Sequence, residues 1–195
     1  MQHHLFSKDF SITTYVDVDP AWAYLCGDGE KVWTYDSEVL GGCWGNLGYK
    51  AASNAEDFIT NKNGIWWTCA PADLTGQLEG LKVPATGEET PDAYMTFILS
   101  GKKIVKNTGS QTINEGTFSF DMTASDSWEI GKLYTSEGAI LFPYMINGNG
   151  YKPTEFDIML LNDKNLVLTY ARLRYGTMGW RLLSGPSRRR NKLII

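Results

Sequence analysis

Three of the seven tryptophans in this 195-residue chain lie in a stretch rich in glycine and poor in regular structure. There "GGCWGNLGYK" begins at residue 41 and "IWWTC" begins at residue 65. A pyranose ring stacks its apolar face on an aromatic ring, while its hydroxyls need hydrogen-bonding side chains nearby. The pattern therefore indicates aromatic capture of a saccharide. The candidate ligand-binding residues are Trp44, Asn46, Tyr49, Trp66, Trp67 and Trp128.

A core position is the alternative for each of these rings, because aromatic side chains dominate burial in protein interiors. The adjacent pair Trp66 and Trp67 allows one geometric deduction. In a strand-like segment, successive side chains point to opposite faces. We therefore expect one of the two in the core and the other facing outward.

Two acids, Glu155 and Asp157, supply the pair of carboxylates that glycoside hydrolysis needs. They lie in "EFDIML" and share one strand face because side chains alternate with a period of two. The stretch resembles the Glu-x-Asp-x-x-Glu strand motif of jelly-roll endoglucanases, but Leu160 stands where the second glutamate would be. We interpret both acids as the wet side of an amphipathic strand, and we keep hydrolysis as an alternative function.

Other catalytic and metal-binding patterns have little support. The only histidines, His3 and His4, lie at the start of the chain, so a nucleophile–histidine site lacks its base and a histidine zinc site lacks its ligands. Four acids offer oxygen ligands for a structural Ca²⁺, although their spacing matches no EF-hand loop. These acids are Asp17, Asp19, Asp28 and Glu30. We expect no catalytic residue, no metal and no cofactor.

Charge and hydropathy restrict the partners. The chain has 18 basic and 22 acidic residues and a net charge of -4, which does not favour contacts with nucleic-acid phosphates. No apolar run reaches the roughly 18 residues that cross a bilayer, and "MQHHLFSKDF" shows no signal peptide. Either the chain is cytosolic, or an export segment with any lipid anchor lies outside it. We expect a monomer that binds a polysaccharide or oligosaccharide.

Strand patterns follow one another at intervals of about ten residues. In "GTFSFDM", Phe118 and Phe120 alternate with Thr117 and Ser119. "EFDIMLL" and "LVLTYA" flank "NDKN", which predicts a hairpin, and "NGNG" at residues 147–150 predicts a turn. The hairpin residues expected to face inward are Phe156, Ile158, Leu160, Leu166, Leu168 and Tyr170. Further predicted strands are "KVWTYD", "AYMTFILS", "KKIVKN", "GAILFPYMI" and a closing "MGWRLL".

These patterns predict an all-β fold, a jelly-roll-like β-sandwich, with a lipocalin-like antiparallel β-barrel as the alternative. The only helical turn that we expect is "NAEDFI". We divide the chain into a frayed N-terminus (1–12), a single β domain (13–183) and a basic tail (184–195). The cysteines, Cys26, Cys43 and Cys69, are odd in number and lack metal-type spacing. We expect buried free thiols, with a Cys26–Cys43 bridge as the alternative.

The order of these signals resembles that in a family of β-rich domains of unknown function. The resemblance rests on "KVWTYD", "GGCWGNLGY", "GIWWTCAPADLTGQ", "YMTFILSG" and "SWEIGKLYTSEGAILFPY" and covers roughly residues 30–182. Such domains occur in surface lipoproteins of polysaccharide-utilising Gram-negative gut anaerobes, often after an immunoglobulin-like (PKD-type) module. The resemblance implies a jelly-roll-like or lipocalin-like domain outside the cytoplasm, at the cell surface or in the periplasm, that binds glycans.

Overall fold

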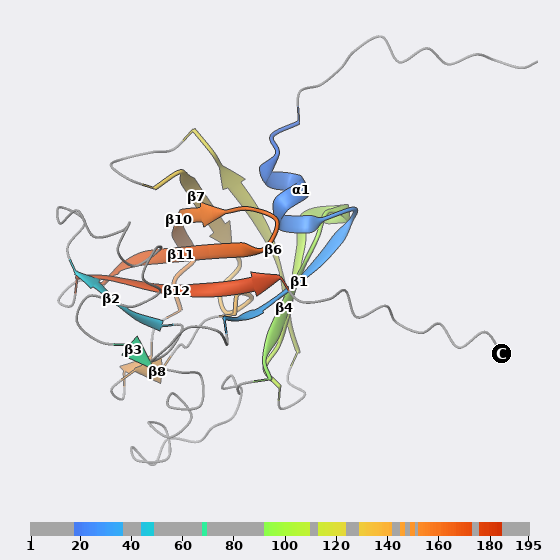
Figure 1. Cartoon of the computed structure of the whole chain (residues 1–195). Coiled ribbons are helices and arrows are strands. Elements are labelled where there is room, and N and C mark those ends of the chain that lie inside the picture. The colour runs from blue at the N-terminus through green and yellow to red at the C-terminus, as the bar shows by residue number, and fades with distance from the viewer. Residues whose placement is uncertain are drawn as a thin grey trace, which may run out of the picture.

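The computed structural model of the protein describes residues 18–36, 44–48, 68–69, 92–109, 113–123, 129–141, 145–146, 149–150, 152–172 and 176–184. The predicted turn "NAEDFI", the N-terminal segment 1–12 and the tail after residue 184 lie outside these residues. Figure 1 shows the elements, which are almost all strands. They are α1 (Ala21–Cys26), β1 (Glu30–Tyr35), β2 (Trp44–Gly48), β3 (Thr68–Cys69), β4 (Tyr94–Ile98), η1 (Ser100–Lys102), β5 (Lys103–Asn107), β6 (Ile113–Asp121), β7 (Gly131–Thr135), β8 (Met145–Ile146), β9 (Asn149–Gly150), β10 (Glu155–Leu161), β11 (Asn165–Arg172) and β12 (Gly176–Ser184).

Eight strands form a closed antiparallel barrel in the order β1-β4-β5-β6-β7-β10-β11-β12. Closure comes from the pairing of β1 with β12, in which Trp33 lies opposite Ser184 and Tyr35 lies opposite Leu182. The short strands β2 and β3 extend the sheet from an earlier part of β12, since Trp180 lies opposite Trp44. The predicted closing strand, "MGWRLL", is therefore confirmed.

The lipocalin-like antiparallel barrel, which is the alternative in the sequence analysis, is the fold, rather than the jelly-roll sandwich. A jelly roll distributes its strands over two sheets through Greek-key connections. Here each barrel strand pairs with the barrel strands before and after it along the chain, and the first pairs with the last. Strand number and alternation are similar in the two architectures, so the difference lies in the pairing alone.

Large apolar side chains fill the inside of the barrel. On β4 and β5 the buried residues alternate with partly exposed ones, as expected for strands with one face in a core. Eight strands leave an interior just wide enough for side chains. The largest fully buried side chains are Trp33, Phe97, Phe156, Leu25, Met95 and Ile104.

Helix α1 packs beside β1 and β4 (Figure 1), and no pattern in the sequence predicts it. The Asp19 carboxylate accepts a hydrogen bond of 2.8 Å from the Ala21 amide and so caps the first turn. Leu25 and Cys26 are buried against the barrel. The Trp22 ring lies 4.3 Å from the Phe120 ring, centroid to centroid. These contacts stabilise a helix that is too short to form by itself.

Lys31 on β1 links α1 to the hairpin between β10 and β11. The Lys31 ammonium donates hydrogen bonds to the Tyr24 carbonyl at 3.1 Å and to the Asp163 carboxylate at 2.9 Å. Its hydrogen bond and charge lower the pKa of Asp163 below the usual value. The antiparallel pairing of β10 with β11 confirms the predicted "NDKN" hairpin. Lys31 joins this hairpin to the first barrel strand.

The segment that follows β7 differs from the prediction. "GAILFPYMI" is expected to be a strand, but Ala139, Ile140 and Leu141 form a buried turn after Gly138, whose φ is 72°. The Leu141 amide donates a hydrogen bond to the Met95 sulfur at 3.2 Å, so the turn packs onto β4. Among the described residues of this stretch, only Met145–Ile146 is strand. It pairs with Asn149–Gly150, the second half of the predicted "NGNG" turn. Residues 142–144 lie outside the described part.

A β-bulge in β10 makes one of the predicted inward residues wrong. Ile158 lies opposite Leu168, but the register then shifts, so that Leu160 lies opposite Val167 and Leu161 opposite Leu166. One extra residue in a strand reverses the faces that follow it. Leu161 therefore belongs to the core in place of the predicted Leu160, whereas the other predicted inward residues of the hairpin belong to it as expected.

Candidate functional site

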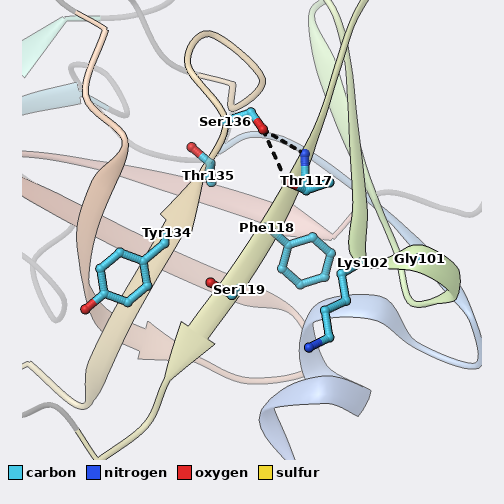
Figure 2. Close-up of a pocket in the computed structure, with 8 residues that line it drawn as sticks. All are labelled: Gly101, Lys102, Thr117, Phe118, Ser119, Tyr134, Thr135 and Ser136. Atoms are coloured by element: carbon cyan, nitrogen blue, oxygen red, sulfur yellow. Dashed lines mark hydrogen bonds between the residues drawn. The ribbon is translucent and has the colours of Figure 1, made fainter.

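A hollow of about 450 Å³ opens on the barrel wall where β6, β7 and the η1 turn meet. Figure 2 shows Tyr134 and Lys102 on opposite sides of the lining residues, with Ser119 and Phe118 between them. Hydroxyl side chains predominate in its lining. The lining residues are Gly101, Lys102, Thr117, Phe118, Ser119, Tyr134, Thr135 and Ser136.

The alternation of β6 explains why this wall is polar. Phe118 is buried, whereas Thr117 and Ser119 on either side of it are exposed. On β7, Tyr134 is the direct partner of Ser119 and keeps 37% of its surface exposed. Within the described part of the chain, no hydrogen bond engages the hydroxyl of either Ser119 or Tyr134. Ser119 and part of Tyr134 therefore face outward at this wall.

Ser136 holds the upper edge of the hollow in place. Its hydroxyl accepts a hydrogen bond of 3.0 Å from the Thr117 amide and lies 3.3 Å from the Thr117 hydroxyl (Figure 2). This approach depends on Gly116, because a Cβ added there would lie 2.6 Å from the Ser136 Cβ. A glycine thus allows the chain after β7 to lie directly on β6.

Thr135 contributes a buried polar atom to the same lining. Only 8% of this residue is exposed, and no group in the described residues hydrogen-bonds to its hydroxyl oxygen. A buried hydroxyl without a partner among the described residues costs free energy, so Thr135 is a locally unfavourable position in this wall.

Lys102 provides the positive charge at the other side of the hollow. Its φ of 48° is left-handed, and it follows Gly101, whose φ is 74°. The Lys102 ammonium lies 5.4 Å from the centre of the Trp22 ring, within the range of a cation–π contact. Among the described residues, no carboxylate forms an ion pair with Lys102.

The two acids predicted as weak catalytic candidates do share a face, since one lysine on β7 reaches both. The Lys132 ammonium lies 2.8 Å from an Asp157 carboxylate oxygen and 3.1 Å from a Glu155 carboxylate oxygen. The hydrogen bond to Asp157, with a smaller contribution from Glu155, raises the pKa of Lys132 above its usual value.

This cluster suits an ion pair better than catalysis. Asp157 is only 5% exposed, so a glycosidic oxygen has no access to its carboxylate. Glu155 is exposed and lies directly opposite Tyr134, beside the hollow. The motif position taken by Leu160 carries no acid, and the bulge displaces it from the alternation that the motif assumes. The two acids therefore form an ion-pair cluster with Lys132 rather than a matched catalytic pair.

The predicted aromatic site lies largely outside the described residues. Tyr49, Trp66, Trp67 and Trp128 are not among them. Trp44 and Asn46 lie on β2, where their backbones are opposite Trp180 and Met178 of β12. Sequence reasoning missed Tyr134 because it assigned no strand to residues 131–135. The exposed alternation of Thr117 and Ser119 was the one available signal for this wall.

Metal and membrane features are absent from the part of the chain that the structure describes. No group of three or more His, Cys, Asp or Glu side chains is placed to hold a metal ion there. Of the acids considered for Ca²⁺, Asp19 caps α1, and Asp17 lies outside the described residues. The described helical residues include no segment of the length and hydropathy that spans a bilayer. Cys26 is a buried free thiol, which excludes the Cys26–Cys43 bridge.

Comparison with known proteins adds no family assignment. No protein-family model matches this chain, and no curated protein is significantly similar to it.

Proposed function

We propose that the protein is a non-catalytic carbohydrate-binding domain that captures a polysaccharide or oligosaccharide at the hollow between β6, β7 and η1. The observation that carries the proposal is the pairing of Ser119 with Tyr134, which leaves an exposed ring beside two hydroxyls that have no partner among the described residues. A sugar needs both kinds of group, an apolar plane for its C–H face and hydrogen-bonding atoms for its hydroxyls.

The size and chemistry of the hollow agree with this proposal. A volume of about 450 Å³ lies within the range of small-molecule sites. Glu155, beside Tyr134, adds an acceptor for sugar hydroxyls. We place the protein outside the cytoplasm, at the cell surface or in the periplasm, because the resemblance to lipoprotein domains favours such a location. We also expect a monomer. Trp44, Asn46, Tyr49, Trp66, Trp67 and Trp128 remain predicted ligand contacts, and none of them is among the described residues that line this hollow.

The two alternative functions have less support. A lipocalin-like carrier needs an apolar cavity inside its barrel, and here large side chains such as Trp33, Phe97 and Phe156 occupy the interior. A glycoside hydrolase needs two accessible carboxylates, and Asp157 is buried against Lys132.

A glycan array probed with the purified protein tests the proposal, followed by calorimetry on the strongest hit. We expect Tyr134→Ala to weaken binding by about tenfold, since truncating a central aromatic contact costs more than 1 kcal/mol. The matched control is Tyr24→Ala, which removes a tyrosine of similar exposure on α1, 39%, and should leave the affinity unchanged. An array without hits, or equal affinity for Tyr134→Ala and the unmodified protein, would contradict the proposal.

A further inference from the structure

The charge of the hollow restricts its ligand further. Several lysines pair with carboxylates, among them Lys31 with Asp163, Lys132 with Asp157 and Glu155, and Lys152 with Glu137. Lys102 has no carboxylate partner among the described residues, and its ammonium lies over the Trp22 ring. The face of an aromatic ring attracts a cation without neutralising it.

No acidic side chain among the lining residues compensates the charge of Lys102, and Glu155, beside Tyr134, is paired with Lys132. None of the eight lining residues is an Asp or a Glu, and every polar lining side chain other than Lys102 is a neutral hydroxyl. The whole chain has a net charge of -4, so this local positive charge stands against the overall balance. A cation in a concave site attracts anions and raises their local concentration.

The backbone at Lys102 has an uncommon conformation in a tight turn. It occupies the left-handed region, at φ 48°, in the tight η1 turn between β4 and β5. Figure 2 shows its side chain running past Phe118 towards α1, on the opposite side of the hollow from Tyr134. A ligand that contacts Tyr134 at one end and extends across the hollow would therefore bring its other end towards the Lys102 ammonium.

We propose that the hollow binds an acidic saccharide, with the carboxylate or sulfate of the sugar against Lys102 and its hydroxyls against Ser119 and Tyr134. The inference rests on the proposed carbohydrate-binding function and adds the class of sugar. Charge-assisted hydrogen bonds are stronger than neutral ones, so Lys102 would dominate the choice between acidic and neutral sugars.

The test uses a glycan array that carries neutral, uronate-bearing and sulfated saccharides, probed with the full chain. We expect the hits to lie among the acidic saccharides. Lys102→Gln should weaken them by about tenfold, the loss expected for one charged hydrogen bond, whereas Lys102→Arg should retain them. Lys164→Gln is the control, because it removes the same charge from an exposed lysine in the β10–β11 turn. Added salt should also weaken binding of the acidic hits.

Two results overturn the inference in distinguishable ways. Hits confined to neutral saccharides, or acidic hits that Lys102→Gln binds as well as the unmodified protein does, would refute the acidic class and leave carbohydrate binding intact. An array with no hits at all would refute both. A circular dichroism spectrum of Lys102→Gln that matches the unmodified protein confirms that a loss of binding comes from the site and not from unfolding.

Discussion

The indole nitrogen of Trp33 donates a hydrogen bond of 3.0 Å to the carbonyl oxygen of Leu25, which joins the first barrel strand to helix α1. Both residues are almost completely buried. Trp33 therefore fills the barrel and at the same time satisfies a carbonyl in the last turn of the helix, where the chain offers no further helical amide. The hollow lies near this junction, since Trp22 of the same helix contacts both Phe118 and Lys102.

Replacing Trp33 with Phe should destabilise the protein by about 3 kcal/mol. The change removes ring volume from a filled core and leaves the Leu25 carbonyl without its partner. Urea unfolding followed by circular dichroism measures the difference. Tyr24→Phe, on the exposed face of α1, is the control and should change the free energy of unfolding by less than about 0.5 kcal/mol. Equal stability of Trp33→Phe and the unmodified protein would show that this bond contributes nothing.

Two lysine substitutions should separate a buried ion pair from an exposed one. Lys132→Gln leaves the buried Asp157 carboxylate without its cation, and we expect a loss of about 3 kcal/mol in the free energy of unfolding. Lys152→Gln breaks a 3.7 Å pair with Glu137 in which both side chains are at least half exposed, and should cost less than about 1 kcal/mol. Similar losses for the two variants would show that burial of Asp157 does not strengthen its dependence on Lys132.

A Cβ at position 116 should prevent the close approach of the chain after β7. It would lie 2.6 Å from the Ser136 Cβ and 2.8 Å from the Ala139 Cβ, so Gly116→Ala should cost about 2 kcal/mol by overpacking. Glu115→Ala, on the exposed neighbouring position, serves as the control. Combining Gly116→Ala with Ser136→Gly removes the clash with Ser136, although not the one with the Ala139 Cβ, and should cost less than the sum of the two single changes. Strict additivity in this cycle would argue against the contact.

Local alternation made much of the barrel predictable. On β6, burial of Phe118 and exposure of Thr117 and Ser119 follow the period of two, because one face of the strand meets the core and the other meets water. On β10 the same reasoning fails after Ile158. Asp157 and Met159 are buried as well, so the strand lacks a clear wet side, and the bulge that moves Leu161 inward in place of Leu160 has no local sequence signal.

Features that depend on distant contacts could not be predicted. Closure of the barrel requires β1 to pair with β12, which lie far apart in the chain, and a sandwich satisfies the same alternation. Helix α1 forms because Leu25 and Trp22 pack on the barrel, and not because six residues favour a helix. The candidate hollow depends on the register that puts Tyr134 beside Ser119, so its chemistry appears only when both strands are in place.

The thiol of Cys26 should make stability fall at alkaline pH. Burial raises its pKa from 9.0 to about 11, so between these values the folded thiol stays protonated while the unfolded thiol ionises. The unfolded state then binds fewer protons, and the free energy of unfolding decreases as the pH rises through this window, by about 1–3 kcal/mol. Urea unfolding at the two ends of the window measures the decrease, and Cys26→Ala should show a shallower one. Identical slopes for the two proteins would rule out this contribution.

Thr169 should be a position where removing a polar atom stabilises the protein. It lies on β11 opposite Asp157, is 0% exposed, and its hydroxyl has no hydrogen-bond partner among the described residues. Valine keeps the branched shape that suits a strand and removes the buried hydroxyl, so Thr169→Val should raise the free energy of unfolding by about 1 kcal/mol. Thr117→Val provides the contrast, because the Thr117 hydroxyl lies on the exposed wall within 3.3 Å of Ser136 and its loss should lower stability slightly. A loss of stability in Thr169→Val, measured by the same urea unfolding, would mean that this hydroxyl finds a partner in solution.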